Sequence, residues 1–98
     1  MLLRRPADAP NLPEEELDRL QEAHLEYMSG LRDEGKMVAN GPFDSQSDES
    51  LRGLCVMGCG VDEARELMSR DPSVAAGRME PDVFVWLIPE GLARFGAA

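Results

Sequence analysis

Long hydrophobic runs are absent from this sequence, and no stretch approaches the ~20 apolar residues that span a bilayer. The first residues, MLLRRPADAP, also lack the order of a signal peptide, because their charges follow a short apolar stretch and no long apolar region comes next. These absences argue against a membrane-spanning segment and against a secretory leader. A cytoplasmic location is the expectation that follows.

Basic residues are scarce as well. The chain has 10 lysines and arginines against 19 aspartates and glutamates, which gives a net charge of −9. Nucleic acids and anionic membranes are bound through basic surfaces, so we expect neither as a partner. The acidic balance favours solubility and says little more about function.

Cysteines and recognisable catalytic motifs are few. Cys55 and Cys59 lie four residues apart in a predicted strand, which places their Cα atoms about 13 Å from each other. A disulfide needs a separation of about 7 Å or less, and two ligands make an incomplete zinc site, so we expect both to act as small apolar side chains. The sequence has no serine-nucleophile motif, phosphate-binding glycine loop or metal-ligand cluster, and it predicts no metal and no cofactor.

What is present is a pattern of alternating helices and strands. The 98 residues fit one domain, with a short strand and loop over 1–12 and a tail over 90–98. The first helix is predicted to have Asn11 as its N-cap and Pro13 near its start, and to run to about Glu34, with Gly35 in the left-handed conformation after it. The other predicted elements are strands over 36–42, 51–59 and 82–89, a helix over 61–70, and a helical turn over 71–77 capped by Asp71.

This order of elements, (β)αββαβ, predicts an α+β sandwich of the ferredoxin-like type. Its antiparallel sheet would carry two helices on one face. The polar connection FDSQSDES, residues 43–50, is longer than the turn of a tight hairpin. It is either a functional flap or a floppy loop.

The predicted strands over 51–59 and 82–89 are apolar on both faces, because apolar residues occupy successive positions along each of them. Two helices cover only one face of a small sheet, and an uncovered apolar face exceeds what a soluble monomer usually shows. We therefore predict a homodimer in which the sheet faces pack on each other, with a higher oligomer as a further option. The alternative is that the tail over 90–98 folds across the second face.

The single histidine lies in an unexpected place, because its neighbours at helical spacing are all apolar. This core-facing stripe consists of Leu17, Leu20, His24, Met28 and Leu31. In a ferredoxin-like sandwich the first helix can meet the turn that ends the second helix, where Asp71 lies. An imidazole whose N–H is held by a carboxylate is an oriented general base, and an acid once it is protonated.

Each candidate residue also has a structural interpretation. A lone histidine on an apolar face is more often a core residue than a catalyst, and Asp71 before Pro72 is a helix-capping signal in its own right. Tyr27 is either a donor to a ligand or a tyrosine at the edge of the core. Asn40 is either a ligand contact or a turn residue. Composition and spacing leave these alternatives open.

Two stretches of the chain together resemble the YCII-related family. The first, AHLEYMSGLRDEGKMVANGP, has a histidine in the first helix, a glycine at its end, a strand and then Gly-Pro, and the next residue completes the Gly-Pro-Phe found in relatives. The second, DPSVAAG followed by a strand that ends in WLIP, is similar to the second motif of that family. The resemblance extends from about His24 to Pro89, with the two motifs in the expected order.

The resemblance implies a ferredoxin-like dimeric α+β barrel with a histidine and an aspartate as its active-site pair. These two positions fall on His24 and Asp71. One branch of the family is linked to dehydrochlorination of a chlorinated, hydroxylated aromatic, whereas most members have no assigned reaction. The family opens with a longer, central first strand than MLLRR, so that strand is either truncated here or starts upstream.

The leading hypothesis is a small cofactor-independent enzyme of lyase type, acting on a small organic substrate that is aromatic in one branch of the family. His24 would move a proton to or from this substrate, and Asp71 would fix the tautomer of the imidazole. The residues predicted to contact the substrate are Tyr27, Asn40, Gly41, Pro42 and Phe43. The rival hypothesis is a non-catalytic ligand-binding or interaction module in which the contact between His24 and Asp71 is structural.

Overall fold

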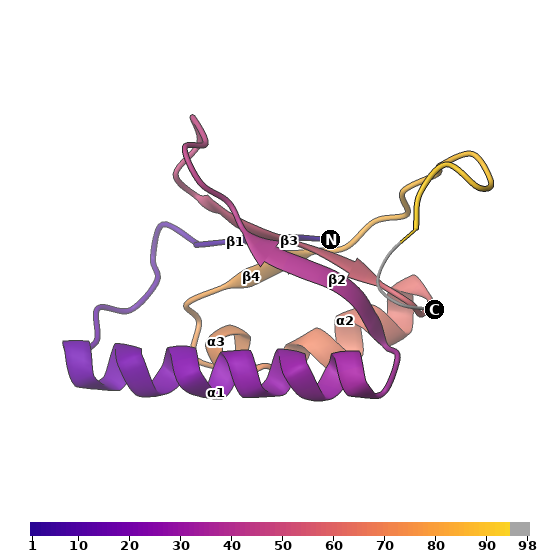
Figure 1. Cartoon of the computed structure of the whole chain (residues 1–98). Coiled ribbons are helices and arrows are strands. Elements are labelled where there is room, and N and C mark those ends of the chain that lie inside the picture. Colours follow the sequence, from indigo (N-terminus) through magenta and orange to yellow (C-terminus); the bar gives the residue numbers. More distant parts are fainter. Residues whose placement is uncertain (95–98) are drawn as a thin grey trace.

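A four-stranded antiparallel sheet forms one layer of the molecule, and three helices lie together on one side of it (Figure 1). The computed structural model describes residues 1–94. The strand order is β2-β3-β1-β4, which agrees with the predicted ferredoxin-like α+β fold. The strands are β1 (Leu2–Arg4), β2 (Met37–Pro42), β3 (Leu51–Met57) and β4 (Glu80–Asp82), and the helices are α1 (Glu14–Asp33), α2 (Val61–Ser69) and α3 (Pro72–Ala75).

The two ends of α1 compare differently with the sequence prediction. Pro13 occupies the N-cap position and no side chain caps the helix, and the Pro13 carbonyl accepts hydrogen bonds from the N–H groups of Glu16 and Leu17. The expectation that Asn11 is the cap is therefore wrong, because the preset φ of proline already directs the chain into the helix. At the other end Gly35 has the predicted left-handed conformation, with φ of +74°, and the next N–H donates to the Leu31 carbonyl.

The core lies between the helices and the sheet and is rich in methionine. Met28, Met37 and Met68 are fully buried, and each such side chain contributes roughly 1.5–3 kcal/mol to stability. On α1, His24 and Leu31 are buried beside Met28, so the predicted core-facing stripe is confirmed over its second half. No helix within residues 1–94 is long and apolar enough to cross a bilayer.

The last strand is shorter than the predicted 82–89 and lies before it, so that the two share only Asp82. β4 ends at Asp82, which lies opposite Leu2 of β1, so beyond this point the register leaves only Met1 on the neighbouring strand. Residues 83–88 continue outside the sheet. The prediction is wrong because apolar alternation alone does not form a strand when the partner strand has ended. Residues 90–94 of the predicted tail are exposed, and its last four residues, 95–98, lie outside the described part of the chain.

A bulge interrupts the pairing of β1 with β3. Leu3 lies opposite Gly53, but Arg4 lies opposite Leu51, so Arg52 is the extra residue between two paired positions. Bulges bend a strand and change the direction of the side chain that they carry. This irregularity lies at the end of β3 that is closest to the loop between β2 and β3.

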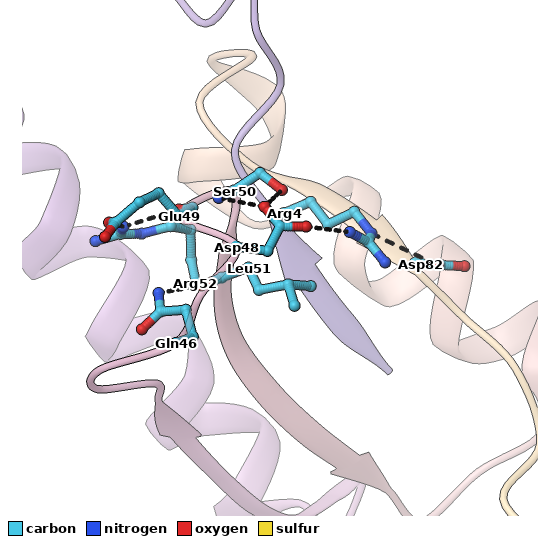
Figure 2. Close-up of polar contacts among 8 residues, drawn as sticks. All are labelled: Arg4, Gln46, Asp48, Glu49, Ser50, Leu51, Arg52 and Asp82. Atoms are coloured by element: carbon cyan, nitrogen blue, oxygen red, sulfur yellow. Dashed lines mark hydrogen bonds and ion pairs between the residues drawn. The ribbon is translucent and has the colours of Figure 1, made fainter.

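That loop, residues 43–50, is held by its own polar contacts (Figure 2). The Asp48 carboxylate accepts hydrogen bonds from the backbone N–H and the hydroxyl of Ser50 at 3.0 and 2.6 Å, and these bonds lower the pKa of Asp48. Asp48 also lies 3.9 Å from the Arg4 guanidinium, and Gln46 donates to the Leu51 carbonyl. These contacts tie the loop to β1 and β3, which favours an ordered loop over a floppy one.

The second face of the sheet carries no helix among the described residues (Figure 1). On this face Leu2 of β1 lies opposite Leu54 of β3, and Val56 lies opposite Ala39 of β2. Leu54 is 39% exposed, whereas Cys55, which points to the helix side, is 2% exposed. The prediction that β3 is apolar on both faces is therefore confirmed, and one of those faces is uncovered in the single chain.

Candidate functional site

The only histidine and a buried aspartate lie in direct contact beneath the sheet. Nδ1 of His24, on α1, is 2.8 Å from Oδ1 of Asp71, which directly precedes α3. His24 is 7% exposed and Asp71 is fully buried. Because an ionised carboxylate only accepts hydrogen bonds, Nδ1 of His24 carries the proton, and in the neutral ring Nε2 carries the lone pair. This is the arrangement of an oriented general base.

The second oxygen of Asp71 has a separate task. Oδ2 accepts a hydrogen bond of 3.2 Å from the backbone N–H of Val74, so Asp71 is the N-cap of α3, as its position before Pro72 predicts. Each oxygen of the carboxylate thus has its own donor. The Asp71 side chain is held in one orientation by the helix end, and it holds the His24 ring in turn.

His24 lines a cavity of about 200 Å³ between α1 and the strands β2 and β3, here called the His24 cavity. Three of the predicted substrate contacts, Asn40, Gly41 and Pro42, line it as well. Among the hydrogen bonds of residues 1–94, none involves Nε2 of His24. Of the two ring nitrogens, Nε2 is therefore the one that does not contact Asp71.

The structure places the other two predicted contacts outside the lining of this cavity. The Tyr27 hydroxyl donates to the Leu67 carbonyl at 2.7 Å, the ring packs against the core, and burial raises the pKa of this hydroxyl. Phe43 donates its backbone N–H to the Arg52 carbonyl at the end of the β2–β3 pair. Tyr27 thus joins α1 to α2, which is the edge-of-core alternative for this residue.

Several residues of the cavity wall belong to no sequence motif and were not predicted to line the site. The other lining residues are Leu3, Arg5, Gln21, Leu25, Arg52, Gly53, Cys55 and Met79. They come from α1, β3, the end of β1 and the segment before β4, so no local pattern could have grouped them. The adjacent arginines of the first strand were a weak signal, since basic residues are scarce in this chain.

Cys55 is the thiol on this wall, and its chemistry is restricted. Burial raises the pKa of Cys55 to about 11, so the thiol stays protonated at neutral pH. A protonated thiol is a poor nucleophile and a poor metal ligand. Within residues 1–94, no three His, Cys, Asp or Glu side chains lie together so that they could hold a metal ion.

Comparison with known proteins adds one match. The family model described as the YCII-related domain matches residues 1–87, which include every strand and both members of the pair formed by His24 and Asp71. No curated protein matches the chain significantly.

Proposed function

Because this chain belongs to the YCII-related domain family, and because a buried His–Asp pair lies at its cavity, we propose that it is a small enzyme that works by proton transfer. His24 would exchange a proton with a small organic substrate, without a cofactor. The observation that supports this proposal is the contact of 2.8 Å between Nδ1 of His24 and Asp71, which leaves Nε2 as the proton-exchanging atom.

The proposed reaction begins with the neutral His24 ring. Its Nε2 lone pair takes a proton from a carbon or hydroxyl group of the substrate, and the ring becomes an imidazolium. The fixed Asp71 carboxylate stabilises this positive charge. The electron pair left on the substrate forms a new double bond as a leaving group such as chloride departs, which is lyase chemistry. Chloride leaves as the free anion, the imidazolium then gives its proton to water, and the neutral ring is restored.

We also propose that the working form is a homodimer joined through the uncovered sheet face. Leu54 is partly exposed on that face, and the apolar residues 84–88 are exposed beside it, with Trp86 58% and Leu87 88% exposed. Soluble monomers rarely keep apolar patches of this kind uncovered. Size-exclusion chromatography with light scattering is expected to give twice the chain mass, and a monomer at micromolar concentration would contradict this proposal.

The catalytic proposal can be tested before the substrate is known. Small molecules that bind are first selected by thermal shift, and exchange of their acidic protons for deuterium is then followed by NMR in D₂O. His24→Asn should slow this exchange by about 10²–10⁴-fold, the usual contribution of a general base. The control is Glu26→Gln, an exposed position on the same helix, which should leave exchange unchanged. Equal exchange in a folded His24→Asn variant would refute the proposed role.

One observation favours the rival function, a non-catalytic ligand-binding module. Asp71 already caps α3, so its contact with His24 is explained in part by folding alone. If this rival is correct, His24→Asn lowers the unfolding free energy, ligand binding persists, and wild-type protein shows no deuterium exchange in any ligand. The same experiment therefore separates the two functions.

A further inference from the structure

Three arginines from distant parts of the sequence approach one another beside the His24 cavity. Arg5 directly follows β1, Arg52 lies at the bulge of β3, and Arg78 precedes β4. Arg5 and Arg52 both line the His24 cavity. Arg5 and Arg78 both line an adjoining cavity of about 250 Å³, which has the exposed Asp18 at its wall. A chain with a net charge of −9 thus gathers positive charge at this one place.

The positive charge of Arg5 is poorly compensated within the described residues. Its Nε is buried and has no hydrogen-bond partner, and none of the ion pairs of residues 1–94 includes its guanidinium. Burial, together with the nearby charges of Arg78 and Arg52, lowers the pKa of Arg5. A buried charge without a partner is unfavourable, and an anion placed beside it would offset that cost.

The neighbouring Arg4 shows what compensation looks like in this molecule. Its guanidinium lies 3.7 Å from Asp82 and 3.9 Å from Asp48 (Figure 2). Arg78 donates a hydrogen bond of 2.8 Å to the Pro10 carbonyl, and none of the ion pairs of residues 1–94 includes it. Arg52 donates a hydrogen bond of 3.1 Å to the Glu49 carbonyl and lies 3.8 Å from the exposed Glu49 carboxylate. Of two adjacent arginines, one is paired on the surface and the other lies unpaired at the cavity.

We propose that Arg5, supported by Arg52 and Arg78, binds the carboxylate of a small organic acid whose apolar part occupies the His24 cavity. The planar guanidinium matches a carboxylate with two parallel hydrogen bonds. Leu3, Leu25 and Met79 supply an apolar wall for the rest of the molecule. The volume of about 200 Å³ restricts the ligand to a small one.

This anion site would also assist the proposed reaction, and to that extent the inference rests on the proposed function. A carboxylate held at Arg5 fixes the orientation of the bound acid, so that one part of it faces His24 in every binding event. The arginines would further stabilise negative charge that develops on the substrate when its proton leaves. Binding of the anion itself does not require catalysis.

The test compares benzoate with benzamide, its neutral analogue of the same shape, by NMR titration of the full chain. Benzoate is expected to bind at least ten times more tightly than benzamide. Arg5→Gln should weaken benzoate binding at least tenfold, and Arg4→Gln, the control at the paired arginine, should change it less than twofold. Arg52→Gln, measured in parallel, should weaken binding several-fold and keeps the test decisive if Arg5→Gln fails to fold.

Three outcomes would overturn the proposal. The first is equal binding of benzoate and benzamide, and the second is unchanged benzoate affinity in folded Arg5→Gln and Arg52→Gln variants. The third is binding of inorganic phosphate but not benzoate, which would make this a phosphate site. Because this experiment measures binding and not catalysis, the proposed anion site and the proposed proton transfer by His24 can be refuted independently. Arg5-dependent benzoate binding without any deuterium exchange leaves the anion site and removes the catalytic role, whereas exchange in neutral ligands alone does the reverse.

Discussion

Two of the cavities depart from the usual pattern of burial in opposite ways. The His24 cavity is lined by His24, which is buried, and by the half-buried Arg5, whose Nε atom is buried. The other cavity, of about 280 Å³, is lined by apolar residues that remain largely exposed, among them Phe84 and Trp86. Buried polar groups and exposed apolar groups are the informative exceptions in a folded protein. The proposed ligand site lies in the first of these regions, and the proposed dimer contact lies in the second.

The difference arises from how each region is closed. Around His24, α1, the capped start of α3 and two strands enclose the polar groups and give Asp71 its full set of partners. Around Trp86, β1 has ended and no strand continues the sheet within residues 1–94. The first region is enclosed within a single chain, whereas the second leaves apolar side chains exposed in the single chain. Three changes test this contrast, and they follow from the largest expected effect to the smallest.

Removal of Asp71 should destabilise the region of buried polar groups around His24. Asp71→Ala takes away the cap of α3 and leaves Nδ1 of His24 without its acceptor, so the unfolding free energy should fall by about 3 kcal/mol. Urea denaturation measures this change. The control is Asp44→Ala, an exposed position, which should stay within about 0.5 kcal/mol of wild type. Equal stability of the two variants would show that the pair contributes little to the fold.

A charge on the uncovered sheet face should weaken the proposed dimer contact. Leu54→Glu places a carboxylate in the proposed dimer contact, and the dissociation constant should rise by about a hundredfold, since burial of an unpaired charge is unfavourable. Light scattering over a dilution series measures this constant. Ala75→Glu introduces the same charge on the helix layer and should leave the dimer unchanged. A dimer that tolerates Leu54→Glu would place the contact elsewhere.

Cys55 lines both cavities. The titration of its thiol therefore tests whether water reaches the position between them. Burial raises the pKa of Cys55 from 9.0 to about 11. The unfolded thiol ionises at a lower pH than the folded one. The contribution of the thiol to the unfolding free energy is therefore fully present below pH 9 and is lost as the pH rises towards 11. At pH 10 the loss should be about 1 kcal/mol.

This loss is measured as the difference in unfolding free energy between pH 8 and pH 10. Other groups also titrate in this range, so the wild type is compared with Cys55→Ala, in which the difference should be smaller by about 1 kcal/mol. Cys59→Ala, at the more accessible thiol, should retain most of it. An unchanged difference in Cys55→Ala would mean that water reaches the thiol.

Most features that depend on neighbouring residues could be predicted from the sequence. The apolar spacing of α1, the left-handed Gly35 and the cap at Asp71 are all local, and the structure has each of them, whereas the local prediction of Asn11 as the cap of α1 is wrong. The meeting of His24 with Asp71 required one further step, the order of the elements, because it joins residues 47 positions apart.

Features that depend on distant partners could not be predicted in this way. Residues 83–88 have the composition of a strand, but whether they join the sheet depends on how far β1 extends beside them. The arginine cluster combines positions 5, 52 and 78, and nothing in the sequence near any of them indicates that the others lie close. Tyr27 shows the same limit, since its hydroxyl partner is a backbone carbonyl 40 positions away.

The bulge in β3 connects the sheet to the charge distribution of the molecule. If the ladder that pairs Leu3 with Gly53 simply continued, Arg52 would lie directly opposite Arg4. Two guanidinium groups would then face each other across the strands, where like charges destabilise a sheet. One inserted residue places Leu51 opposite Arg4 instead and leaves Arg52 available to the His24 cavity. The extra residue thus avoids repulsion between Arg4 and Arg52 within the sheet, and it places the charge of Arg52 where an anionic ligand could bind.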